Sequence, residues 1–390
     1  MKQDGVTAAQ AWAQLPCLRE PRPNGSHALA AAVESVRDWL EALGLPVQLH
    51  PFRLRPYFME LLGLWLALGG LGLLAAASLR AGLAWLGLPL ALLLVAVPLA
   101  ETRFLRPAVS GLVRRPAHNL AVTSPPAGQV LREVVVAAHL DTKTEWLDHA
   151  RRRVLLRLGR PAMVLAVASG LLLALTALLP AARWAALLLA LPVAAYGLGM
   201  GANLLGGRLS RRPSSGAVDD GAAVAVVLGL AARLQGGTPA LRHTAVTLLV
   251  TVGEEAQMQG ALAYVHGRAW PLPACAVNLE LLGQDGSYVL WTENGTATLR
   301  HAMDPGLNDA LARAVEGVTG CPAALLPLIN DDALAFLRAG IPAATLGSLD
   351  TSLGDRGLHS ALDHPGRVLP VRLDEAVEVL GRLLTALDGA

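Results

Sequence analysis

The chain has 390 residues, of which 53% are hydrophobic and 16% charged, and its mean hydropathy is +0.46. These values exclude a protein that is soluble along its whole length, and they exclude intrinsic disorder, which requires few apolar residues and many charges. A formal net charge of +2 gives no electrostatic basis for binding nucleic acid. Cys17, Cys275 and Cys321 are widely spaced, which favours a reducing compartment over a disulfide framework. The basic residues are almost all arginine, and we interpret this as a sign of a GC-rich bacterial genome.

Four uncharged, apolar runs predict helices that span a membrane. They lie between the charged residues Glu60 and Arg80, Arg80 and Glu101, Arg160 and Arg183, and Arg183 and Arg208. Each run is long enough for the roughly 20 residues that a helix needs to cross the hydrocarbon core of a bilayer. Buried core helices are the alternative, but amphipathic packing requires a polar face that these runs lack. We therefore expect two transmembrane hairpins, at residues 56–103 and 151–210.

The arginines that flank these hairpins predict an orientation. Most of them lie at the outer ends of the hairpins, whereas the tight turns within the hairpins contain only Arg80 and Arg183. Short flanks rich in Lys and Arg stay in the cytoplasm, and the first residues of the chain lack the apolar stretch of a signal peptide. We therefore expect a multi-pass protein of the bacterial inner membrane, with its non-membrane part on the cytoplasmic side.

The predicted spans favour an anchor over a channel or a carrier. Channels and carriers place ionisable groups within the membrane, and these spans contain none. Gly197 and Gly201 have the GxxxG spacing that is typical of closely packed helices.

The rest of the chain predicts one α/β domain that the hairpins interrupt. This domain comprises residues 1–55, 104–150 and 211–390. Apolar segments with the character of buried strands alternate with segments of helical periodicity. The expected strands lie near Val47 and at 119–122, 133–138, 245–252, 276–282 and 342–346, and the expected helices at 221–234, 260–266, 307–315 and 373–387. This alternation indicates three αβα layers around a mostly parallel sheet, with ligands at the carboxyl ends of the strands.

Polar residues interrupt the apolar sequence at those strand ends. They are His139, Asp141, Asp219, Asp220, Glu254, Glu255, Glu280, His359 and Asp363. Imidazoles and carboxylates that come from several strands to one edge are typical of a divalent metal site with mixed nitrogen and oxygen ligands. Each residue also has an ordinary explanation: Asp219 as a helix cap, the paired glutamates as solvated surface, and His359 as incidental. The combination favours the metal site.

In order along the chain, the motifs AAHLDT, GAVDDGAAVAVVLGLA, VGEEAQMQGA, VNLELLG, FLRAGIPA and LHSALDHP resemble those of the co-catalytic di-zinc exopeptidases of metallopeptidase family 28, in clan MH. That family includes aminopeptidases, glutamate carboxypeptidase and glutaminyl cyclases. The resemblance implies two Zn²⁺ ions per chain. One would be held by His139, Asp219 and Glu280. The other would be held by Asp219, Glu255 and His359, so that Asp219 bridges the two ions.

The resemblance also implies two catalytic roles. Glu254 would be the general base that takes a proton from a metal-activated water, and Asp141 would orient the imidazole of His139. Glu280 stands where the aminopeptidases usually have Asp, and Asp331 and Asp332 begin a triplet that is usually Ser-Asp-His.

We expect a membrane-anchored aminopeptidase that hydrolyses short peptides. Carboxypeptidase activity, glutaminyl cyclase activity and a catalytically inactive membrane scaffold remain open as alternatives. The preferred residue at the cleaved end, the native metal and the oligomeric state are also open.

Overall fold

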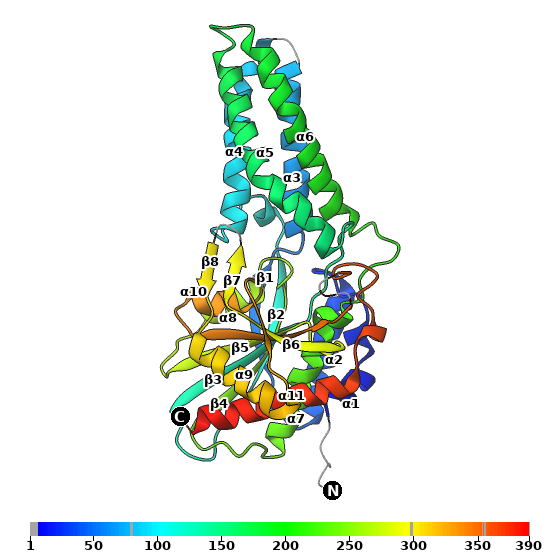
Figure 1. Cartoon of the computed structure of the whole chain (residues 1–390), viewed down its shortest axis with the longest axis vertical. Helices are drawn as coiled ribbons and strands as arrows, with labels where there is room; N and C mark the ends of the chain where they lie inside the picture. The colour runs from blue at the N-terminus through cyan, green and yellow to red at the C-terminus, as the bar shows by residue number, and fades with distance from the viewer. Residues whose placement is uncertain (1–6, 79–80, 297–298, 353, 355, 390) are drawn as a thin grey trace. The chain divides into compact units, whose positions relative to one another are not determined.

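The structure is a computed structural model of the whole chain (Figure 1). It describes residues 7–78, 81–296, 299–352, 354 and 356–389. The chain forms two compact units. The α/β unit comprises Met1–Pro56, Arg114–Lys143 and Ser214–Ala390, and the helical unit comprises Tyr57–Val113 and Thr144–Pro213. The helical unit is therefore inserted into the α/β unit at two places along the chain.

An eight-stranded sheet forms the centre of the α/β unit, with the strand order β1-β2-β4-β3-β5-β10-β6-β9. Its strands are β1 (Gln48–Leu54), β2 (Arg115–Ser124), β3 (Arg132–His139), β4 (Thr244–Thr251), β5 (Ala274–Glu280), β6 (Gly286–Trp291), β9 (Ala324–Leu326) and β10 (Ala343–Asp350). The central strands β4, β3, β5 and β10 are parallel to one another. Antiparallel pairing joins β2 to β4 and β6 to β10. A separate hairpin contains β7 (Glu293–Thr296) and β8 (Leu299–Ala302).

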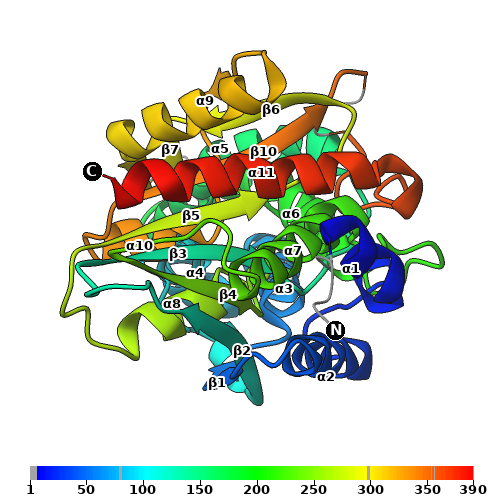
Figure 2. The same cartoon turned by 90° about the horizontal axis from the view of Figure 1, so that it is seen from below.

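Helices cover both faces of this sheet, which confirms the predicted three-layer αβα fold. The helices of the α/β unit are α1 (Ala8–Gln14), α2 (His27–Ala42), α7 (Ala222–Gln235), α8 (Gln259–His266), α9 (Pro305–Thr319), α10 (Ala333–Arg338) and α11 (Pro370–Asp388). On one face, α7 packs on β3 and β4, and α11 packs beside α7 and α9 (Figure 2). On the other face, α8 packs on β1 and β2, and α10 packs on β5 and β10.

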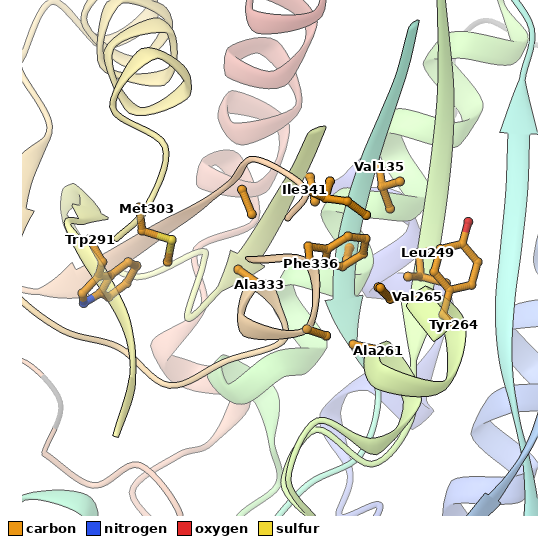
Figure 3. Close-up of a cluster of buried hydrophobic side chains, with 14 of the residues drawn as sticks. Val135, Leu249, Ala261, Tyr264, Val265, Trp291, Met303, Ala333, Phe336 and Ile341 are labelled. Carbon is orange, nitrogen blue, oxygen red and sulfur yellow. The ribbon is translucent and has the colours of Figure 1, made fainter. Parts of the chain in front are cut away.

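A buried apolar cluster joins α8 and α10 to the sheet (Figure 3). Phe336 of α10 and Tyr264 of α8 lie in the same cluster as Val135 of β3 and Leu249 of β4. Each large apolar side chain that is fully buried contributes about 1.5–3 kcal/mol to stability. This packing holds β3 and β4 in place, and it thereby fixes the positions of the polar residues at the ends of these strands.

The helical unit consists of four long apolar helices. They are α3 (Phe58–Ser78), α4 (Gly87–Thr102), α5 (His149–Leu175) and α6 (Ala182–Gly206). The segments Phe58–Ser78, Gly82–Thr102, Arg151–Leu175 and Ala182–Gly206 are long and apolar enough to cross a membrane, judged by length and composition. The predicted orientation depends in part on Arg80 and Arg183, the arginines in the turns of the hairpins. Arg80 lies outside the residues that the structure describes.

Glycines allow α3 and α6 to pack closely within this unit, as their spacing predicted. A Cβ atom added at Gly197 would lie 2.3 Å from the carbonyl oxygen of Leu66 in α3. A Cβ atom at Gly201 would lie 2.9 Å from the carbonyl oxygen of Gly63. Both distances are shorter than any ordinary contact, so only glycine allows the two backbones to approach this closely.

Candidate metal centre

The carboxyl ends of the parallel strands bring the predicted polar residues to one edge of the sheet. His139 is the last residue of β3, and Glu280 is the last residue of β5. Glu254 and Glu255 follow β4, and His359 lies in the loop after β10. Since these four strands are neighbours and run in the same direction, their ends meet.

Asp219 lies at the centre of the cluster, in the turn Ala217–Gly221 that leads into α7. Its Oδ1 atom is 3.2 Å from Nε2 of His139, and its Oδ2 atom is 3.1 Å from Nε2 of His359. Glu255 Oε1 lies 3.0 Å from Nε2 of His359. Glu280 Oε1 lies 3.7 Å from Nε2 of His139. One carboxylate therefore faces two imidazoles, and each imidazole faces a further glutamate.

The geometry of the cluster fits metal binding better than hydrogen bonding. His139 Nε2 and Glu255 Oε1 are buried and form no hydrogen bond with the described residues, although potential partners lie close to them. The Nδ1 atom of His139 lies 3.0 Å from the backbone carbonyl oxygen of Asp141. A carbonyl oxygen can only accept, so Nδ1 donates, and the lone pair that Nε2 carries when it is unprotonated is directed at the carboxylates. Borderline metals such as zinc prefer this donor set of imidazole nitrogen and carboxylate oxygen.

Asp220 is a second aspartate near the same imidazole. Ligand atoms of His139, Asp220 and Glu280 lie within 4.8 Å of one another, and those of Asp219, Glu255 and His359 form a second such group. Asp220, however, accepts backbone N–H groups with both oxygens: that of His139 at 3.3 Å and that of Leu281 at 3.2 Å. We therefore favour Asp219 as the shared ligand, because both of its oxygens face imidazole nitrogens.

The electrostatics of the cluster favour a bound cation. Burial alone lowers the pKa of His139, but the close carboxylates of Asp219 and Glu280 outweigh burial, and the net pKa is well above its usual value. Burial raises the pKa of Glu280 to about 8, against the lowering effect of His139. Burial also raises the pKa of Glu254 well above its usual value, and the neighbouring carboxylates add to this effect. An excess of buried carboxylates stabilises positive charge, whether a proton or a metal ion carries it.

The contact of Asp141 differs from the predicted one. Its carboxylate is 3.8 Å from Nδ1 of His139, and the backbone carbonyl oxygen is the closer acceptor. The carboxylate instead accepts the backbone N–H groups of Gly253 at 2.6 Å, Glu254 at 3.1 Å and Glu255 at 3.1 Å. Asp141 thus holds the loop that carries two of the predicted site residues, and its backbone orients the imidazole.

The backbone at His359 is unusual for a residue of this type. Its φ is +61°, in the left-handed region that non-glycine residues rarely adopt. Residues held in this region tend to lie at functional sites, where the surrounding structure compensates for the strain. This conformation directs the His359 imidazole towards Asp219 and Glu255.

Several residues that contribute to the site were not predicted from the sequence. Lys143 Nζ lies 3.6 Å from Oε2 of Glu255, and its place in the HLDTK run two residues after Asp141 was the available signal. Asp363, noted earlier without a role, accepts the backbone N–H of Val218 at 2.8 Å and so supports the turn that contains Asp219. Nothing in the sequence pattern pointed to Asn24, which donates to the Asp141 carboxylate at 2.7 Å.

Comparison with known structures shows the same fold. An aminopeptidase from Aneurinibacillus sp. strain AM-1 is similar over 96% of this chain and 92% of its own, with a TM-score of 0.55 and 13% identity. A Bacteroides thetaiotaomicron glutaminyl cyclase bound to N-acetylhistamine is similar over 97% and 96%, with a TM-score of 0.57 and 13% identity. A Zn-dependent exopeptidase from Parabacteroides distasonis is similar over 97% and 96%, with a TM-score of 0.56 and 12% identity. No curated protein sequence matches the chain.

The sequence itself matches a family model. Residues 200–383 match the model of peptidase family M28. The matched segment contains Asp219, Glu254, Glu255, Glu280 and His359, which the structure gathers at one edge of the sheet. The matched segment agrees with the motifs of the sequence, and the fold agrees with that of the solved exopeptidases, so this chain is similar to peptidase family M28.

Proposed function

We propose that this protein is a membrane-anchored metallo-exopeptidase, an aminopeptidase that hydrolyses short peptides with two Zn²⁺ ions per chain. The observation that carries the proposal is the Asp219 carboxylate, whose two oxygens face His139 and His359 at 3.2 and 3.1 Å. Glu280 and Glu255 lie beside these imidazoles and would complete two ligand sets around the shared aspartate. The match of residues 200–383 to a peptidase family model supports hydrolysis of a peptide bond as the reaction.

The residues around the metal ligands would then perform distinct steps. Zinc ions held in the cluster would polarise a peptide carbonyl and make water more acidic. Glu254 Oε2 lies 3.9 Å from His139 Nε2, and Asp141 holds its backbone N–H, so its carboxylate stays at the cluster. Glu254 is the proposed general base, which takes a proton from the attacking water and returns it to the leaving amine.

Replacement of the base tests this function. Glu254→Gln removes the proton acceptor but keeps the shape of the side chain, so we expect kcat to fall about 10²–10⁴-fold while zinc content stays unchanged. The substrates are aminoacyl p-nitroanilides and carboxyl-blocked dipeptides, assayed on the full chain in detergent with and without chelator. Glu293→Gln is the matched control, because Glu293 pairs with Arg300 in the β7–β8 hairpin. Parent-like turnover by Glu254→Gln would contradict the proposal, and a zinc-loaded parent without turnover would favour the scaffold.

Glutaminyl cyclase activity is a second candidate. The group of Asp219, Glu255 and His359 could hold a single ion without the other ligands. Zinc counted per chain, together with an assay on a peptide with an N-terminal glutamine, separates the two activities. One ion and release of ammonia would support the cyclase, whereas two ions and release of the first amino acid would support the aminopeptidase.

The membrane anchor and its orientation are part of the proposal. Trp85 lies in the short helical segment Ala81–Leu86 before α4, and Trp184 lies in the first turn of α6. They are 69% and 72% exposed, as expected of side chains at the interface between membrane and water. A cysteine placed at Leu178, which is 85% exposed in the connection between α5 and α6, should react with an impermeant maleimide added to intact cells. The natural Cys321, exposed in the α/β unit, should not react until the cells are opened. The reverse pattern would contradict the cytoplasmic placement.

A further inference from the structure

Arg22 is a fully buried arginine in the N-terminal segment of the α/β unit. Its side chain is 1% exposed, and the described ion pairs include none to Arg22. Its guanidinium instead donates to backbone carbonyl oxygens. The acceptors are Leu140 at 2.6 Å, Cys17 at 2.7 Å, Glu20 at 2.6 Å, Ser215 at 3.3 Å and Gly216 at 2.9 Å. A buried charge of this kind requires many well-placed partners, because its desolvation is unfavourable.

The acceptors belong to two segments that are far apart in the chain. Leu140 lies between His139 and Asp141, whereas Ser215 and Gly216 lie shortly before Asp219. The second insertion of the helical unit, Thr144–Pro213, separates these segments. Arg22 therefore bridges the two positions at which the α/β chain leaves for that insertion and returns from it.

The backbone of Arg22 reinforces the same junction. Its N–H donates to Oγ1 of Thr142 at 2.8 Å, and the N–H of Thr142 donates to the carbonyl oxygen of Arg22 at 3.0 Å. Gly216 has a φ of +61°, and a Cβ atom there would lie 2.0 Å from Cγ2 of Thr142. The returning segment thus packs directly against the departing one, and Arg22 contacts both.

The positive charge of Arg22 is consistent with a position close to several buried carboxylates. Burial lowers the pKa of Arg22 to about 10, and the nearby carboxylates of Asp363, Asp141 and Asp220 oppose this effect. The guanidinium therefore keeps its charge at neutral pH and partly offsets the concentration of carboxylates around the metal ligands.

We propose that Arg22 is a positioning residue of the metal centre: by binding carbonyls on both sides of the second insertion, it sets the separation of His139 from Asp219. The inference rests on the proposed function of this cluster as a zinc site. A long insertion between two ligands leaves their spacing dependent on non-local contacts, because closing such a loop costs conformational entropy. Arg22 supplies these contacts from a third segment of the chain.

The test measures zinc affinity and the folding of the metal-free protein separately. The full chain is purified in detergent and stripped of metal, and zinc is titrated against a chromogenic chelator. Arg22→Lys keeps the charge but cannot reach acceptors on both segments, so we expect zinc to bind at least 10-fold more weakly. Arg132→Lys is the matched control, since Arg132 donates to the carbonyl oxygen of Leu387 at 2.6 Å from the opposite end of the same strand as His139. This control should bind zinc as the parent does, at a similar melting temperature of the metal-free protein.

A second variant keeps the inference testable if Arg22→Lys does not fold. Thr142→Val preserves shape and removes the acceptor of the Arg22 N–H, and we expect it to weaken zinc binding several-fold. If Arg22→Lys folds and binds zinc as tightly as the parent, the inference is overturned. If Arg22→Lys does not fold, parent-like zinc affinity of Thr142→Val overturns it instead. Both results leave the proposed function intact. Equal loss of affinity in Arg132→Lys would overturn it too, by showing a general effect of stability. A parent chain that takes up no zinc would overturn the proposed function and this inference together.

Discussion

At the scale of single residues, Asp141 connects several parts of the candidate metal centre. Its carboxylate accepts from the loop of Glu254 and Glu255 and from the side chain of Asn24, and its carbonyl oxygen accepts from His139. Asp141→Asn replaces one accepting oxygen with an NH₂ group that faces N–H donors. We expect the loop to shift and zinc affinity to fall about 10–100-fold, which is the usual effect of removing a group that orients metal ligands.

The matched control for this variant is Asp304→Asn. Asp304 accepts the N–H of Leu307 at 2.7 Å as the N-cap of α9, a position where Asn caps equally well. Zinc titration of both variants separates loss of charge in general from loss of the Asp141 contacts. If Asp141→Asn binds zinc with parent affinity, the loop does not depend on that carboxylate.

At the scale of elements, the contact of α3 with α6 depends on glycine. Gly197→Ala places a methyl group against the Leu66 carbonyl oxygen, 2.3 Å from the added Cβ atom, so the helices must separate. We expect the helical unit to lose about 1–3 kcal/mol of stability, as in other overpacked sites. Unfolding in detergent, followed by helical circular dichroism, measures the effect.

Gly199→Ala on the same helix is the control. The nearest atom to a Cβ there is Cδ2 of Leu155 at 3.7 Å, an ordinary contact. The higher helix propensity of Ala should leave this variant as stable as the parent or more stable, by up to about 1 kcal/mol. If Gly197→Ala and Gly199→Ala were equally stable, the close approach of the α3 and α6 backbones at Gly197 would not limit stability.

Local patterns predicted most of the elements, because each has its own periodicity. The strands expected at 133–138 and 245–252 correspond to β3 and β4, and the helices expected at 221–234 and 260–266 correspond to α7 and α8. The strands β6, β7, β8 and β9 were not predicted. They are short, and their pairings depend on partners elsewhere in the chain, which periodicity does not encode.

The same distinction applies to the site. The residues that the strand ends deliver to one edge of the sheet could be named from their positions after apolar runs. The contacts that orient them could not, because the acceptors of Arg22 are backbone carbonyls and the donors to Asp141 are largely backbone N–H groups. Every residue has a backbone carbonyl, and every residue except proline has a backbone N–H, so a sequence does not mark which of these groups are used.

At the scale of the whole molecule, removal of metal should affect the two units differently. Without a cation, the buried carboxylates of the centre repel one another, and bound zinc at 100 times its dissociation constant would stabilise the fold by about 2.7 kcal/mol. We expect chelation to increase hydrogen exchange at the carboxyl ends of β3, β4, β5 and β10, and to leave α3, α4, α5 and α6 unchanged. Equal exchange with and without chelator would contradict a metal-stabilised centre.

The pH dependence of the metal-free protein has a defined sign. The folded pKa of Glu280 is raised to about 8, and that of His139 is raised well above its usual value. Groups with raised folded pKa values bind protons more tightly in the folded state, so the stability they contribute decreases as pH rises towards 8. Thermal melts of the chelated protein should therefore show a falling melting temperature from pH 6.5 to 8. Zinc-loaded protein should show little change over this range, because zinc replaces the proton, and a parallel decrease in both forms would place the titrating groups outside the metal centre.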